Sequence, residues 1–165
     1  MEKFKVLLVD DHADFRRVVH DFLKKLPNVS TISEAADGEE AIQKANELHP
    51  DIILMDISMP LKSGSAQRVE SATVGGRNIS GLEATRVIKQ RQPTTKVIIA
   101  TMHNSPAYRS QALEAKADGF ILKSSLKPSL EAIFGSNHDN DSKTSEVRKS
   151  GRIIYSHSTL LRSKG

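Results

Sequence analysis

The 165-residue chain contains no cysteine, which excludes disulfide bonds, thiolate metal sites and cysteine nucleophiles. Any chemistry must therefore use oxygen and nitrogen groups. Long apolar runs are missing too, because no stretch approaches the length of a membrane span. The N-terminal segment, MEKFKVLLVDD, reaches charged residues too early for a secretory signal. Together these absences predict a cytoplasmic protein without a membrane partner.

Positive charge is unevenly distributed along the chain. The formal charge is +4, yet residues 135–165 alone contain six Lys/Arg against three Asp/Glu. This segment is polar and has too few apolar residues to bury a core, so we expect one domain over residues 1–134 and a flexible basic tail over 135–165. Contact of the tail with nucleic acid or an acidic partner is the alternative, although Tyr155 is its one aromatic residue.

Short apolar runs alternate with helical periodicity in residues 1–134. The runs predict buried parallel strands at 4–9, 52–55, 97–100 and 120–122, and a weaker strand at 31–35. Apolar spacing predicts helices within 15–26, 41–48, 81–90, 106–116 and 128–134, with Pro128 as the first residue of the last one. With right-handed crossovers, these units predict an α/β, doubly wound, five-stranded parallel sheet in the order 2-1-3-4-5 with helices on both faces, which is flavodoxin-like.

Polar residues follow four of the predicted strands. Asp10 and Asp11 come after VLLV, Asp56 after DIILM, Thr101 after KVIIA and Lys123 after GFIL. In a parallel sheet these positions share the edge at which ligands bind, and in the predicted order the first and third strands are neighbours. Three converging carboxylates repel one another, and a hard cation such as Mg²⁺ relieves that repulsion. The cluster suits a divalent cation and a phosphoryl group.

Six stretches carry a family resemblance: VLLVDDHADFRRVV, EAADGEEAI, HPDIILMDISMP, SGLEATRVIK, KVIIATMHNS and ADGFILK. Their order and intervals resemble the receiver domain of response regulators in two-component signalling, and they cover roughly residues 3–134. The stretch ADGFILKSS is similar to the corresponding stretch of receivers attached to LuxR-type helix-turn-helix output domains. No such output domain is visible in this sequence.

The resemblance implies a phosphoacceptor and its metal site. Asp56 would take a phosphoryl group from a phosphohistidine on a sensor histidine kinase or phosphotransfer protein. Asp11 would bind Mg²⁺ directly, Asp10 largely through water, and Asp56 together with the backbone carbonyl of Ser58 would complete the protein ligands. Such a protein is a signalling receiver rather than an enzyme, although it assists its own Mg²⁺-dependent phosphorylation and dephosphorylation.

The resemblance also implies a switch and its outputs. Lys123 would pair with the phosphoryl group, and the Thr101 hydroxyl would bond one of its oxygens, which would let Phe120 turn inward at the family's aromatic switch position. A homodimer through the fourth helix, fifth strand and fifth helix is one expected consequence. DNA would be a partner only if an output domain is missing from this chain.

Several alternatives remain open at this stage. Receivers usually reach a glycine soon after the Met-Pro pair, whereas residues 61–79 form an insertion before Gly81. We interpret it as a flexible surface loop. The alternatives are a lid beside Asp56 and a displacement of the third helix that impairs activation. A degenerate receiver that acts as a phosphorylation-independent binding scaffold is the alternative function. Phe120 could be core filler, and the six histidines are interpreted as solvated or packing residues.

Overall fold

The computed structural model describes residues 3–59 and 79–134. The predicted insertion at 61–79, apart from Ile79, and the predicted tail at 135–165 lie outside the described residues.

A five-stranded parallel sheet forms the centre of the domain, and its order is β2-β1-β3-β4-β5, as predicted. The strands are β1 (Phe4–Val9), β2 (Val29–Ala35), β3 (Ile52–Met55), β4 (Lys96–Thr101) and β5 (Gly119–Leu122). Nearly continuous burial of β1, β3, β4 and β5 explains why they could be recognised as apolar runs. The edge strand β2 begins two residues earlier than predicted, because its partly exposed residues give little apolar signal.

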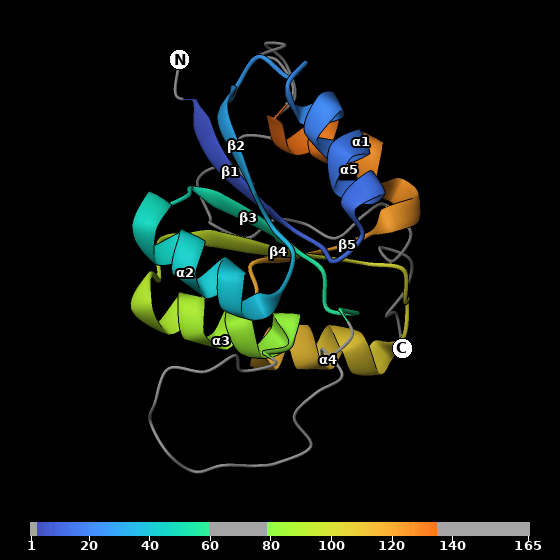
Figure 1. Cartoon of the computed structure of the whole chain (residues 1–165). Coiled ribbons are helices and arrows are strands. Elements are labelled where there is room, and N and C mark those ends of the chain that lie inside the picture. The colour runs from blue at the N-terminus through green and yellow to red at the C-terminus, as the bar shows by residue number, and fades with distance from the viewer. Residues whose placement is uncertain (1–2, 60–78, 135–165) are drawn as a thin grey trace, which may run out of the picture.

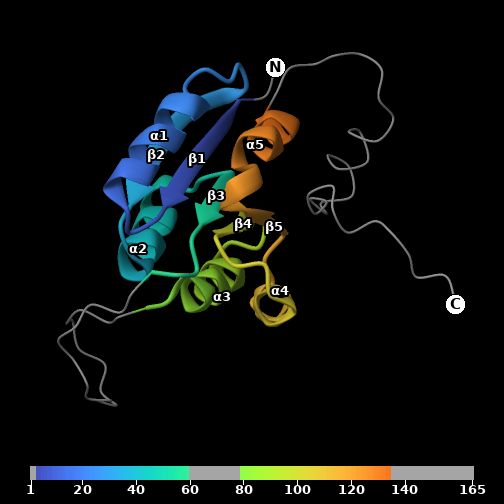
Figure 2. The ribbon, with the colours of Figure 1, turned by 90° about the vertical axis from the view of Figure 1, so that its right-hand side faces the viewer.

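Helices cover both faces of the sheet (Figure 1; Figure 2). They are α1 (Ala13–Leu23), α2 (Gly38–Leu48), α3 (Gly81–Arg91), α4 (Pro106–Glu114) and α5 (Leu126–Phe134). One apolar cluster joins α1 and α5 to one face, and a second cluster joins α2, α3 and α4 to the other. The doubly wound α/β architecture is therefore confirmed.

Four helices differ by more than one residue from their predicted bounds, and two of the differences are that α2 begins at Gly38 and α4 ends at Glu114. The first helix ends at Leu23, so Leu26 packs against the core from beyond the helix, and Val18 is 56% exposed rather than part of the buried face. The prediction that the last helix begins at Pro128 is wrong, since α5 begins at Leu126 after a 3₁₀ turn at Lys123–Ser125. Pro128 is tolerated as the third helical residue because N–H groups of the first turn have no intrahelical acceptor.

Close backbone packing brings together the polar residues that follow β1 and β3. The Asp56 N–H donates to the carbonyl of Val9 (2.9 Å), which ties the end of β3 to the end of β1. The start of α3 lies directly against this point, because a Cβ atom added to Gly81 would stand 2.0 Å from the Asp56 carbonyl oxygen. Only a residue without a side chain permits that approach.

Candidate functional site

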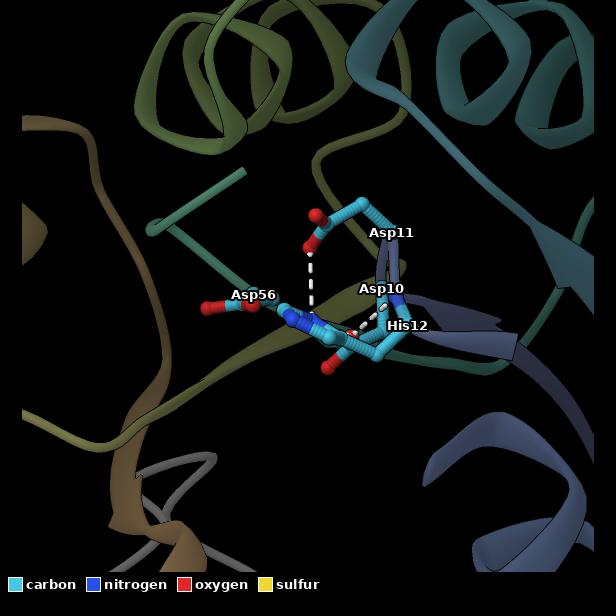
Figure 3. A group of neighbouring side chains, drawn as sticks. All are labelled: Asp10, Asp11, His12 and Asp56. Atoms are coloured by element: carbon cyan, nitrogen blue, oxygen red, sulfur yellow. Dashed lines mark hydrogen bonds and ion pairs between the residues drawn. The ribbon is translucent and has the colours of Figure 1, made fainter. Parts of the chain in front are cut away.

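Three carboxylates converge at the edge of the sheet where the strands end (Figure 3). Val9 pairs with Met55 in the β1–β3 register, so the next residues, Asp10 and Asp56, emerge side by side. Both are almost completely buried, and Asp11 is partly exposed. Ligand atoms of these three residues and His12 all lie within 4.8 Å of one another. The structure thus brings together the acidic residues that the sequence pattern predicted to meet.

Lys123 closes the cluster from the end of β5. Its Nζ donates to Asp10 Oδ2 at 2.5 Å and to Asp56 Oδ2 at 2.9 Å, and its side chain is 8% exposed. Burial by itself would lower the Lys123 pKa, but the hydrogen bonds and charges of the two aspartates outweigh it and raise that pKa above its usual value. The ammonium is therefore held in its charged form and offsets part of the repulsion between the carboxylates.

His12 belongs to the cluster, which sequence reasoning missed. The residue is exposed, as expected of a solvated histidine, yet its Nδ1 lies 3.1 Å from Asp11 Oδ1 and 3.3 Å from Asp10 Oδ1. Its backbone N–H also donates to Asp10 Oδ1 (2.9 Å). The available signal in the sequence is its position directly after two predicted site aspartates.

The donor set fits a hard divalent cation. Among the described residues, none donates a hydrogen bond to the buried Asp11 Oδ1, even though His12 Nδ1 lies 3.1 Å from it, so this oxygen has a lone pair available for a ligand. Such an atom is costly unless a ligand satisfies it. Carboxylate oxygens from Asp10, Asp11 and Asp56 are the ligands that Mg²⁺ prefers. The exposed Ser58 donates its N–H to Asp56 Oδ1 (2.9 Å), which orients the Asp56 carboxylate.

Thr101 and Phe120 lie apart from this contact network. Thr101 is fully buried at the end of β4, and its Oγ1 accepts from the backbone N–H of His103 (3.1 Å). Phe120 is buried within the cluster that contains α4, and the Arg109 guanidinium carbon stands 4.7 Å from its ring centroid. The described contacts link neither residue to Asp56, so their roles in a switch stay predictions.

A supporting layer beneath Asp10 was also missed by sequence reasoning. Arg16 donates from Nη1 to the Asp10 carbonyl (2.6 Å) and from Nε to Glu34 (3.0 Å), and His20 contacts the same carboxylate. Burial acts to raise the Glu34 pKa, but the hydrogen bonds from His20 and Arg16 bring it below its usual value. These contacts join β2 to α1 and fix the backbone that carries the site aspartates.

Comparison with known proteins decides the family. The family model described as the response regulator receiver domain matches residues 6–67 and 77–135. The chain belongs to the response-regulator receiver family. This receiver is of the kind found in two-component systems, and its acidic cluster is a group that could hold a metal ion.

Relatives of this receiver are regulators of greater length. It is 32% identical to the transcriptional regulatory protein DegU of Brevibacillus brevis, over 73% of this chain and 44% of that protein. It is 37% identical to the response regulator protein VraR of Staphylococcus aureus, over 78% of this chain and 54% of that protein. The chain thus spans about half the length of these curated relatives.

A solved LuxR-family receiver has the same fold. The crystal structure of a two-component response regulator of the LuxR family from Aurantimonas sp. is 28% identical, with a TM-score of 0.64. The alignment covers 93% of this chain and 100% of the other. The predicted likeness to LuxR-type receivers is therefore confirmed. Within residues 3–59 and 79–134, each helix is too short or too polar to cross a membrane.

Proposed function

We propose that this receiver accepts a phosphoryl group on Asp56 from a phosphohistidine of a sensor histidine kinase or phosphotransfer protein. The observation that carries the proposal is the bridge from Lys123 Nζ to the buried Asp10 and Asp56, made beside the partly exposed Asp11. A structural ion pair needs one carboxylate for one ammonium, whereas this arrangement holds surplus negative charge at a single point. Surplus charge of that kind is costly to folding and suits a site that binds a cation.

Asp10, Asp11 and Asp56, with the carbonyl of Ser58, are the proposed ligands of Mg²⁺. The buried, unsatisfied Asp11 Oδ1 supports this assignment. When bound, Mg²⁺ supplies positive charge that neutralises the carboxylates and the oxygens of a phosphoryl group. The His12 imidazole lies beside these proposed ligands.

The chain's own residues perform the transfer by position and charge. The P–N bond of the donor phosphohistidine breaks as a bond forms between phosphorus and a carboxylate oxygen of Asp56. The Ser58 N–H holds one oxygen of that carboxylate, and Lys123 holds the other. As charge spreads over the equatorial phosphoryl oxygens, the Lys123 ammonium stabilises them without first having to become protonated.

The proposed response passes through Thr101 to Phe120. A new phosphoryl oxygen on Asp56 would accept a hydrogen bond from the Thr101 hydroxyl and would draw it away from the His103 N–H. The freed space would allow Phe120, now packed beneath Arg109, to change its position. The face formed by α4, β5 and α5 would then contact a protein partner or a second copy of the chain.

The division of the chain is part of the same proposal. Residues 1–134 would form the receiver, and the interruption of the family match between residues 67 and 77 supports an insertion within 61–79. Residues 135–165, which lie outside the described residues, would be a basic segment that follows the receiver. A DNA-binding output would belong to a longer protein, as the coverage of DegU and VraR suggests.

Intact mass spectrometry tests the phosphoacceptor. Wild type incubated with Mg²⁺ and a small-molecule phosphodonor should gain one phosphoryl group, and omission of Mg²⁺ should remove the adduct. Asp56→Asn should gain none, because an amide oxygen is a poor nucleophile. Asp21→Asn, which alters an exposed carboxylate of α1, should be labelled as wild type is.

Unchanged labelling of Asp56→Asn would refute the assignment of Asp56. If folded wild type gains no adduct, the result favours the alternative of a phosphorylation-independent binding scaffold.

A further inference from the structure

The Lys123 ammonium is enclosed by an aromatic ring as well as by two carboxylates. Nζ stands 4.4 Å from the ring centroid of Phe15, within the range at which a cation is attracted to an aromatic face. The same atom donates to Asp10 and Asp56. A lysine ammonium has three donor hydrogens, and the carboxylates take two of them. The Phe15 ring therefore covers a side of the ammonium at which no described residue offers a hydrogen-bond acceptor.

Tertiary packing produces this contact, since Phe15 lies on α1 and Lys123 begins the 3₁₀ turn after β5. Phe15 is half-buried and packs against the apolar cluster that joins α1 and α5 to the sheet. An aliphatic residue at this position would fill the same space against the lysine stem. It would not attract the ammonium, because the attraction comes from the ring quadrupole.

We propose that Phe15 is a positioning residue whose ring holds the Lys123 ammonium beside Asp56, ready to contact the phosphoryl group. This inference rests on the proposed phosphoacceptor function. During transfer the ammonium must give up carboxylate contacts and bond phosphoryl oxygens instead. An aromatic face attracts the cation but offers no competing hydrogen bond, so the ammonium keeps its place and remains free to exchange partners. The Phe15 ring also excludes water, which strengthens the attraction between the Lys123 ammonium and the phosphoryl group.

Variants of two phenylalanines on the same helix separate this role from general packing. Phe15→Leu removes the aromatic face and keeps an apolar side chain, and Phe15→Tyr retains the face. Phe22→Leu is the matched control, because Phe22 packs against the same apolar cluster without contacting Lys123. With Mg²⁺ and a small-molecule phosphodonor, Phe15→Leu should be labelled about three- to tenfold more slowly than wild type. Phe15→Tyr and Phe22→Leu should stay within about twofold.

Combination with Lys123→Ala tests whether the effect passes through the ammonium. Phe15→Leu should slow labelling no further in the Lys123→Ala background, because the ring then has no cation to hold. The inference is overturned if Phe15→Leu is labelled at the wild-type rate, if Phe22→Leu is slowed equally, or if the slowing persists without Lys123.

A second readout needs neither metal nor phosphodonor. Protons above an aromatic face resonate upfield, so the ε-methylene protons of Lys123 should be displaced upfield from those of the exposed lysines in NMR spectra of wild type. Lys123→Arg identifies the signal. The displacement should vanish in Phe15→Leu and persist in Phe22→Leu. A Lys123 signal that coincides with those of exposed lysines would overturn the inference.

The two readouts separate the two proposals. Failure of the phosphoacceptor function appears as wild type that takes no phosphoryl group while its Lys123 signal is still displaced. Failure of the Phe15 inference alone appears as normal labelling of Phe15→Leu.

Discussion

At the edge where the strands begin, Asp118 lies between Lys89 and Lys96, whereas at the edge where they end, Lys123 lies between Asp10 and Asp56. Lys89 and Lys123 are both 8% exposed. Lysine and aspartate thus form a nearly buried ion pair at each end of one sheet.

The two bridges differ in whether their polar atoms are satisfied. Lys89 Nζ donates to the carbonyls of Pro93 and Thr95 and to Asp118, which uses all three of its donors. Asp118 also accepts from the Val97 N–H (2.9 Å). At the other edge one ammonium bonds two of three clustered carboxylates, and among the described residues Asp11 Oδ1 accepts no hydrogen bond. The first edge is complete as a structural joint between α3, β4 and β5, and the second has capacity for a cation.

The same chemical change at the two edges should have opposite effects. Asp118→Asn should lower the free energy of unfolding by about 3 kcal/mol, because the nearly buried Lys89 ammonium loses its charged partner. Asp11→Asn should raise it by about 1 kcal/mol in the absence of divalent cations, since the repulsion from Asp10 and Asp56 that it removes outweighs its contact with the exposed His12 imidazole. Urea unfolding at mildly alkaline pH measures both. Destabilisation by both variants would remove the distinction between the edges.

Addition of Mg²⁺ should stabilise one edge and leave the other unaffected. At about ten times its dissociation constant, the ion should raise the free energy of unfolding of wild type by about 1.4 kcal/mol. Asp118→Asn should retain this increment and Asp11→Asn should lose most of it. Thermal unfolding with and without chelator provides the measurement. An equal increment in Asp11→Asn would place the ion elsewhere.

Acid should weaken the layer that supports Asp10 only as the pH falls below the ordinary pKa of a glutamate. The Glu34 pKa is lowered from about 4.5, so its contribution is present above that pH and is lost as the pH falls through the lower, folded-state pKa. Glu34→Gln should therefore lower the free energy of unfolding by about 0.5 kcal/mol at neutral pH. In this variant the free energy of unfolding should also fall less steeply as the pH is lowered. Unfolding followed from neutral pH downward tests this. Glu131→Gln, an exposed control on α5, should retain the wild-type slope.

The parts of the molecule that could be predicted are those governed by local pattern. Buried runs revealed β1, β3, β4 and β5, and the handedness of the crossovers then led to the sheet order. Convergence of Asp10 and Asp56 followed from that order alone, because parallel strands in register end at one edge. Helix bounds were less accurate, as α5 shows, since the 3₁₀ turn before it has no apolar periodicity to reveal it.

By itself, then, the sequence determined which polar groups stand at which strand ends, because strand order and register place backbone positions. Only the tertiary structure decided how those groups are joined. Lys123 turns to Asp10 as well as Asp56, the Phe15 ring covers it, and the Thr101 hydroxyl bonds the His103 N–H. These contacts depend on how α1 and the turn after β5 pack against the sheet. Such side-chain directions are set by neighbours distant in sequence, so no local spacing encodes them.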